Sequence, residues 1–143
     1  MGDAITYAGG CTCGLSTLQV TLPEPLHHYT PRACDCDYCQ ALGAAYLSAP
    51  GARIDVRSER TLRRERQGSE QAEFLRCSGC GDLLAVIADF EGELRGAVNA
   101  QRLEGRAALA PSQPASPKLL DGGTKRERWQ SLWGLAAVRE GDT

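Results

Sequence analysis

The sequence predicts a mainly β domain cross-linked by clusters of cysteines, and three observations support this fold class. Apolar and polar residues alternate over residues 15–22, which is the period of a strand with one buried face. Short apolar runs elsewhere end at glycine, proline or acidic residues, as strands do at turns. Only 6% of the residues are aromatic, so the core is thin and the seven cysteines are expected to add stability as metal ligands.

The predicted strands follow one another with short turns between them. Residues 83–88 are the most apolar run and are expected to form a central strand. Pro50-Gly51 and Glu91-Gly92 are the clearest turn signals. We expect an extended entry at residues 5–10, strands at 15–22, 44–49, 53–57, 62–66, 83–88, 94–100 and 118–120, and a segment at 73–76 that leads into the last cysteine pair.

Three other segments carry different signals. One or two helical turns are expected over residues 36–42, ended by glycine. Residues 106–117 hold three prolines among serines and alanines and are expected to form a loop. A short C-terminal helix is predicted over residues 125–138, because Trp129, Leu132, Trp133 and Ala136 recur at helical spacing and would anchor it to the core or to a partner subunit.

Length and charge narrow the class of protein. The chain is expected to form a single domain over residues 1–143. Sixteen Lys and Arg against eighteen Asp and Glu leave a net charge of −2, so no basic face for nucleic acid is predicted. Residues 1–10 show no export signal, and no stretch approaches the roughly 18 apolar residues of a membrane span. Seven reduced cysteines without an export signal fit a cytoplasmic protein.

The outer four cysteines form two pairs with the spacing of metal ligands. Cys11 and Cys13 flank a single residue, Cys77 and Cys80 flank two, and glycine follows each pair. A glycine at that place lets the chain turn sharply with a positive φ. Two such pairs supply the four thiolates of a closed structural zinc site. The sequence therefore predicts a first zinc, held by two cysteine knuckles.

The other cysteines lie in one short run, Cys34, Cys36 and Cys39. A strand sends alternate side chains the same way, and a turn after Cys36 would bring the third sulfur back. Three thiolates make an incomplete tetrahedral shell, so a second zinc with a free position is predicted here. Two alternatives stay open: a second structural zinc completed by His27, His28 or an aspartate, and disulfides formed by six of the seven cysteines.

The order of these motifs resembles the glutathione-dependent formaldehyde-activating enzyme family, which includes centromere protein V. The resemblance rests on Gly-Gly-Cys-x-Cys-Gly at residues 9–14, Cys-x-Cys-x-x-Cys at 34–39 and Cys-x-x-Cys-Gly at 77–81. The stretch Ala97-Val98-Asn99 with Leu103-Glu104 is similar to a Val-Asn and Leu-Asp stretch of that family. The resemblance runs from about residue 7 to residue 103.

The resemblance implies a fold, two metal sites and an activity. The fold would be the β-tent, built of twisted antiparallel sheets. The activity ascribed to the family is addition of glutathione to formaldehyde, which read backwards is a carbon–sulfur lyase reaction. Asp35, Gln40 and Phe74 depart from residues common in the family. The structural zinc would be held by Cys11, Cys13, Cys77 and Cys80, and the catalytic zinc by Cys34, Cys36 and Cys39.

The expected function is a zinc-dependent enzyme that adds a thiol such as glutathione to formaldehyde or another small aldehyde. Thiol addition needs the thiolate, and zinc lowers the pKa of a bound thiol. Asp35 or Asp37 would accept a proton or only hold nearby backbone, while Arg32 or Arg53 would bind a glutathione carboxylate. The alternative is a non-catalytic zinc-binding module that contacts a protein. The expected partners are the thiol and the aldehyde, with neither nucleic acid nor membrane, and a homo-oligomer stays open.

Overall fold

The computed structural model describes residues 4–34, 44–66, 72–105, 108–109, 113–115 and 133–141, and these are mainly β. They contain eleven strands and two 3-10 turns, η1 (Leu26–His28) and η2 (Ala100–Arg102). The strands are β1 (Ile5–Gly10), β2 (Ser16–Leu22), β3 (Arg32–Cys34), β4 (Ala45–Leu47), β5 (Arg53–Ser58), β6 (Arg63–Glu65), β7 (Glu73–Arg76), β8 (Leu83–Phe90), β9 (Glu93–Asn99), β10 (Gln113–Ala115) and β11 (Gly134–Glu140). The predicted fold class, mainly β, is confirmed.

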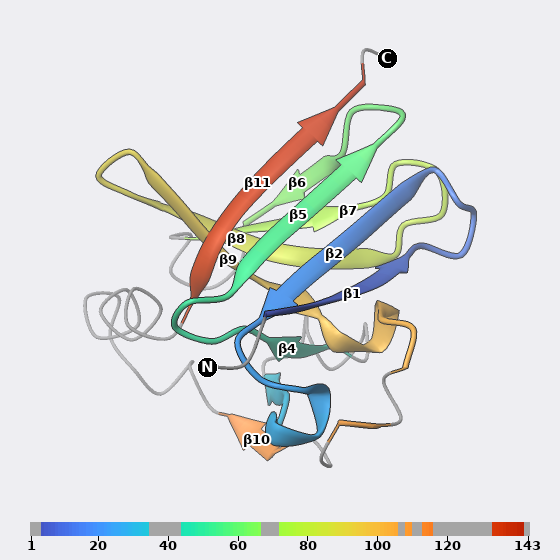
Figure 1. Cartoon of the computed structure of the whole chain (residues 1–143). Coiled ribbons are helices and arrows are strands. Elements are labelled where there is room, and N and C mark those ends of the chain that lie inside the picture. Colours follow the sequence, from blue (N-terminus) through green and yellow to red (C-terminus); the bar gives the residue numbers. More distant parts are fainter. Residues whose placement is uncertain are drawn as a thin grey trace.

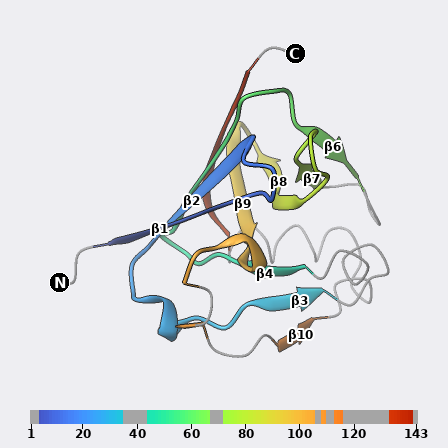
Figure 2. The same cartoon turned by 90° about the vertical axis from the view of Figure 1, so that its right-hand side faces the viewer.

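The eleven strands of the described residues belong to one sheet that divides at β9. Along the main path the order is β1-β2-β5-β11-β9-β4-β3-β10, and β8, β7 and β6 branch from the opposite edge of β9. The shared edge of β9 pairs with β11 at Arg95 and Gly96 and with β4 at Val98 and Asn99. Figure 1 shows β11, β5 and β2 side by side, and Figure 2 shows β4, β3 and β10 across the base of the molecule.

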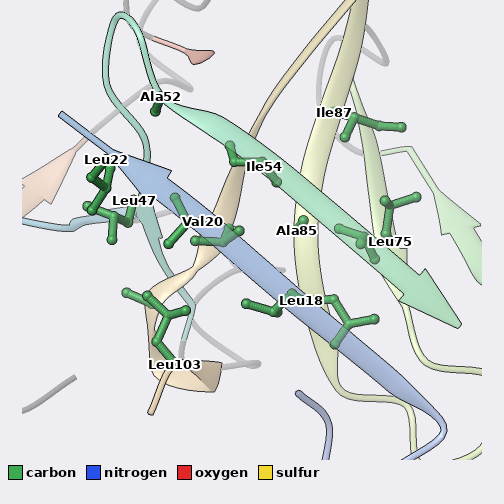
Figure 3. Close-up of a cluster of buried hydrophobic side chains, with 14 of the residues drawn as sticks. Leu18, Val20, Leu22, Leu47, Ala52, Ile54, Leu75, Ala85, Ile87 and Leu103 are labelled. Carbon is green, nitrogen blue, oxygen red and sulfur yellow. The ribbon is translucent and has the colours of Figure 1, made fainter. Parts of the chain in front are cut away.

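The core lies where β2 and β5 cover β7 and β8. Along β2, Leu18, Val20 and Leu22 are buried and alternate with more exposed neighbours, as their period of two predicts. These side chains pack with Ile54 of β5 and Ile87 of β8 in one cluster, which Figure 3 draws. The other face of β8 packs in a second cluster made of Ala72, Val86, Ala88, Phe90, Ala97 and Trp133. Apolar packing on both faces confirms β8 as a central strand.

The hairpin between β8 and β9 turns at Glu91-Gly92, as predicted. Phe90 pairs with Glu93, so only two residues form the turn. Their φ angles are 56° for Glu91 and 90° for Gly92, and both are positive. Two positive φ values are the signature of a type I′ turn, which prefers Asn-Gly or Asp-Gly. Glutamate at the first position is therefore a residue under backbone strain.

Replacing Glu91 by asparagine is expected to raise the free energy of unfolding by about 0.5 kcal/mol, because asparagine tolerates a positive φ better than glutamate does. Urea unfolding of the two proteins measures the difference. Gly92→Ala is the matched variant and should lower stability, since the Cβ of alanine is strained at the φ of 90° that this position adopts. Equal midpoints for the Glu91→Asn variant and the unchanged chain would contradict the assignment of this turn.

The predicted C-terminal helix is wrong where the structure describes it. Residues 134–140 form β11, which pairs in parallel with β5 from Leu135↔Arg53 to Glu140↔Ser58. Alanine and leucine favour a helix locally, but pairing with two neighbouring strands overrides that preference. Trp133 is buried in the second cluster, so it does anchor this segment to the core. The pairs β11–β5 and β10–β3 are parallel, so the sheet is mixed and the prediction of twisted antiparallel sheets is corrected in this respect.

The proline-rich segment contains a short strand that the sequence did not predict. Residues 113–115 form β10, which pairs in parallel with β3 so that Ala115 stands opposite Cys34. The expected helical turns at residues 36–42, the strand at 118–120 and the first part of the predicted helix, residues 125–132, lie outside the described residues. Within the part of the chain that the structure describes, no helix is long and apolar enough to cross a membrane.

Candidate metal centre

The first cysteine pair lies in the turn that joins β1 to β2. Cys11 follows the last residue of β1, and its backbone N–H donates to the Ser16 carbonyl across the turn at 3.1 Å. Gly14 has a φ of 83° and donates its N–H to the Cys11 carbonyl. Gly14 therefore adopts the positive φ that the sequence pattern predicts, and this conformation places Cys11 and Cys13 in one compact loop.

The second pair lies in the turn that joins β7 to β8. Cys77 follows the last residue of β7, and its N–H donates to the Asp82 carbonyl at 2.9 Å. Gly81 has a φ of 79° and donates to the Cys77 carbonyl at 2.9 Å. The two cysteine loops are thus built alike, each inside an antiparallel hairpin and each closed by a glycine with a positive φ.

The four outer sulfurs meet at one point. Cys11, Cys13, Cys77 and Cys80 place their Sγ atoms within 4.8 Å of one another. The distance between Sγ atoms is 3.5 Å for Cys11–Cys13 and for Cys13–Cys77. A tetrahedral site with Zn–S bonds of about 2.3 Å separates its sulfurs by about 3.8 Å. The four residues therefore form a group that could hold a metal ion, and the donor set and spacing fit a closed tetrahedral thiolate shell.

Backbone N–H groups also point at these sulfurs. Ser16 N–H donates to Cys11 Sγ at 3.3 Å, and Gly79 N–H donates to Cys77 Sγ at 3.4 Å. Burial opposes the charged form of Cys77, but the Cys80 N–H, the Ser16 hydroxyl and the Gly79 N–H outweigh it and lower the pKa to about 6. Bonds of this kind stabilise thiolates, which is the form that binds a metal.

The thiol of Cys13 differs from that of Cys77, because its pKa is shifted in the opposite direction. The Leu15 N–H lowers the pKa of Cys13, but desolvation and hydrogen bonds with the other three sulfurs raise it to about 12. Without a metal, buried Cys77 therefore loses its proton more readily than exposed Cys13. A metal ion that replaces these protons removes the competition among the sulfurs, so metal binding releases protons and weakens as the pH falls.

A carboxylate joins the two cysteine loops. Asp82 Oδ2 accepts from the Thr12 N–H at 2.7 Å, from the Thr12 hydroxyl at 2.6 Å and from the Arg102 guanidinium at 2.9 Å. Arg102 also donates to the Thr12 hydroxyl at 3.2 Å. Burial alone would raise the pKa of Asp82, but the Thr12 and Cys80 donors and the Arg102 charge lower it. We call Thr12, Asp82 and Arg102 the clasp.

Sequence reasoning missed the clasp. Thr12 lies between two ligands and Asp82 follows a ligand pair, so their positions relative to the cysteines could have drawn attention to them. Nothing in the sequence, however, indicates that residue 12 contacts residue 82 or that Arg102 reaches both. Their contact depends on how the β1–β2 and β7–β8 hairpins pack, which local patterns do not encode.

The middle cysteines lie almost wholly outside the described residues. Cys34 is the last residue of β3, and its backbone stands in the sheet between β4 and β10. Its side chain, Cys36, Cys39 and the neighbouring Asp35 and Asp37 are not described. The structure therefore leaves the second predicted zinc site as a prediction.

Two histidines and two arginines that the sequence suggested for that site lie among the described residues. His27 and His28 lie in η1 with their rings in edge contact at 4.5 Å, and His28 Nδ1 is 3.8 Å from Glu24 Oε2. Arg32 is exposed on β3, and Arg53 of β5 lies 3.6 Å from Asp55. None of these contacts involves a cysteine of the described residues.

Asn99 connects the clasp to the strands below it. Its Oδ1 accepts from the N–H groups of Gln101 and Ala45, at 3.2 and 3.3 Å, and its Nδ2 donates to the Leu83 carbonyl at 3.0 Å. The side chain is 3% exposed. One buried amide thereby joins η2, which carries Arg102, to β4, to β8 and, through the β4–β3 pairing, to the strand that ends at Cys34.

Comparisons with known proteins bear on the fold alone. No protein-family model matches the chain, and no curated protein matches it significantly. Among solved structures, it is similar to the crystal structure of a Rhodobacter sphaeroides protein that was a structural genomics target. The alignment covers 74% of this chain and 99% of that one, with 25% identity and a TM-score of 0.53. That description names no activity, so the family resemblance seen in the sequence stays a prediction.

Proposed function

We propose that the chain is a zinc protein with one closed and one open thiolate site, and that it acts as a carbon–sulfur lyase-type enzyme on adducts of a small thiol and an aldehyde. The observation that supports this most is the meeting of the outer four sulfurs within 4.8 Å. A shell that four cysteines complete has no place for a fifth, so Cys34, Cys36 and Cys39 would be the donors of a second site in this proposal. The motif order and its resemblance support the reaction class.

The closed site has a structural role in this proposal. Its ligands come from two hairpin turns more than sixty residues apart in the sequence, and a metal there fastens β1–β2 to β7–β8. Glutathione and formaldehyde are the thiol and aldehyde that the resemblance favours. A non-catalytic binding module would use the same closed site, and the two readings differ only in what Cys34, Cys36 and Cys39 do.

The reaction joins a thiol sulfur to an aldehyde carbon. The thiol loses its proton, the sulfur–carbon bond forms, and the carbonyl oxygen takes up a proton, so no oxidant or reductant is needed. Zinc bound by Cys34, Cys36 and Cys39 would supply an open coordination position that favours a thiolate. Asp35 or Asp37 would accept the thiol proton, and Arg32 would attract a substrate carboxylate.

We expect two zinc ions per chain and measurable conversion of glutathione and formaldehyde to S-hydroxymethylglutathione. Elemental analysis counts the metal, and exchange spectroscopy by NMR follows the conversion, which also proceeds slowly without enzyme. The triple variant Cys34→Ser, Cys36→Ser, Cys39→Ser should keep one zinc and the fold but lose the acceleration, because three ligands of one site are removed.

Two results would decide against parts of this proposal. One zinc per chain in both proteins, with conversion at the uncatalysed rate, would favour the non-catalytic module. No bound zinc in freshly reduced protein would overturn the closed site as well. The variant Thr12→Ser controls for effects of mutagenesis and purification on the metal content, since it adds no ligand and keeps the hydroxyl of the clasp.

A further inference from the structure

The carboxylate of Asp82 is the centre of a group of short hydrogen bonds between the two cysteine loops. One carboxylate oxygen accepts three hydrogen bonds of 2.6 to 2.9 Å, and one of the donors is a guanidinium. Hydrogen bonds to ionised groups are about twice as strong as neutral ones. Thr12 and Asp82 lie 70 positions apart and in different hairpins. The bonds therefore hold the two cysteine loops together independently of any metal.

We propose that Asp82 and Arg102 are positioning residues for the four-sulfur site: they hold the cysteine loops in register so that the site is preorganised, and they tie it to the strands that lead to Cys34. This inference rests on the proposed zinc at Cys11, Cys13, Cys77 and Cys80. Neither residue is assigned as a metal ligand. Their effect is on how tightly and how long the metal is held.

Preorganisation follows from the position of the bonds. Thr12 lies between Cys11 and Cys13, so fixing its N–H and its hydroxyl fixes the loop on which both sulfurs stand. Asp82 lies two residues after Cys80, and its own carbonyl accepts from the Cys77 N–H. The clasp thus orders both ligand pairs in advance, and less entropy is lost when a metal binds.

Arg102 extends the clasp to a second part of the sheet. It is the last residue of η2, whose Gln101 N–H is held by Asn99 Oδ1. The same oxygen accepts from Ala45 N–H of β4, and Ala45 pairs with Ala33 in β3, next to Cys34. A continuous series of bonded groups therefore runs from the closed site to the strand that carries the first cysteine of the open one.

Arg102 of the clasp also lines a hollow in the surface. A hollow of about 690 Å³ is lined by Cys11 and Arg102 together with Gln101 and Arg57. Arg102 therefore lines a hollow beside the Cys11 side of the site. Loosening the Arg102–Asp82 pair is expected to let the β1–β2 loop move away from the β7–β8 loop at that surface.

The test is the rate at which the zinc-loaded full-length chain gives up its metal to a chromophoric chelator. The variant Asp82→Asn is expected to release the zinc of the closed site at least about tenfold faster, as is typical when a residue that supports a metal ligand is lost. Thr12→Val should speed release and Thr12→Ser should restore it, because only serine keeps the hydroxyl donor. Asp89→Asn is the matched control: it also removes a carboxylate that accepts a backbone N–H, at 2.8 Å, but at the far end of β8.

Two further readouts separate positioning from general stability. Cobalt-loaded Asp82→Asn should show the tetrahedral thiolate absorption of the unchanged protein at saturation, since all four ligands remain. Amide hydrogen exchange at Ala45 should rise in Arg102→Met and stay unchanged in Asp89→Asn. If Asp82→Asn does not fold, the Thr12→Val and Thr12→Ser pair still decides the matter.

Release from the Asp82 and Thr12 variants at the rate of the unchanged protein would overturn the inference and leave the proposed zinc site intact. Failure of the unchanged protein to bind zinc would overturn the proposed function itself. Faster release without any change at Ala45 would refute the link to β4.

Discussion

Replacing Cys77 with serine is expected to release the metal and to lower the melting temperature by on the order of 10 °C. Cys77 is fully buried in the main core cluster and provides one of the four sulfurs of the closed site. A metal that binds only the folded chain stabilises it by about 4 kcal/mol when its free concentration is 1,000 times the dissociation constant. The variant loses this contribution and gains a buried hydroxyl, so differential scanning calorimetry should show a clear shift.

Chelation separates the two causes of this loss. A strong chelator should lower the melting temperature of the unchanged chain by a similar amount and leave Cys77→Ser almost unaffected. Ser78→Ala is the neighbouring control, because Ser78 stands in the same loop and is not a ligand. A Cys77→Ser protein that melts like the unchanged chain in excess zinc would show that the four sulfurs carry no stabilising metal.

Replacing Asn99 with alanine is expected to cost on the order of 3–5 kcal/mol of unfolding free energy. The change leaves the N–H groups of Ala45 and Gln101 and the carbonyl of Leu83 without their side-chain partner. Each buried polar group left unpaired costs about 1–3 kcal/mol, and the lost side chain also leaves a cavity. Urea unfolding measures the change in unfolding free energy directly. Faster amide hydrogen exchange in β4 would show that the loss of stability begins at the strand that Asn99 holds.

Asn99→Asp distinguishes the hydrogen bonds from the cavity. Aspartate keeps the acceptor for both N–H groups and nearly the same volume, but it loses the donor to Leu83 and brings a charge into a site that is 3% exposed. It should therefore also be destabilising, and more so at neutral pH than at acid pH. Gln101→Ala, two residues further along, should be nearly neutral because that side chain is exposed. An Asn99→Ala variant as stable as Gln101→Ala would refute the role given to this amide.

Strands with a local signature could be predicted from the sequence. The alternation of Leu18, Val20 and Leu22 is an energetic requirement, since a strand with one buried face must put every second residue into the core. The apolar run of β8 and the turn at Glu91-Gly92 follow from equally local causes. The β11 strand does not, because its Leu-Ala-Ala stretch prefers a helix and becomes a strand only through pairing with β5, about eighty residues earlier.

The candidate site also contains residues that the sequence predicts and residues that only the packing of distant segments brings together. The ligand pairs Cys11–Cys13 and Cys77–Cys80 could be predicted, because residue type and spacing alone identify them as metal ligands. The structure brings these four residues together. The clasp could not be predicted, because Thr12, Asp82 and Arg102 are common surface residue types. Their contact arises only from the packing of the β1–β2 and β7–β8 hairpins. Cys36 and Cys39 lie outside the described residues, so the open site depends on motif order alone.

The place of β11 in the sheet has a consequence for biosynthesis. It is the last strand to leave the ribosome among those described, yet it lies between β5 and β9 rather than at an edge. Until residues 134–140 emerge, β5 and the N-terminal half of β9 each present unsatisfied backbone to solvent, which is the kind of surface that chaperones recognise and that nascent chains use to aggregate. Nascent chains stalled before this point should therefore depend on chaperones far more than the released protein does.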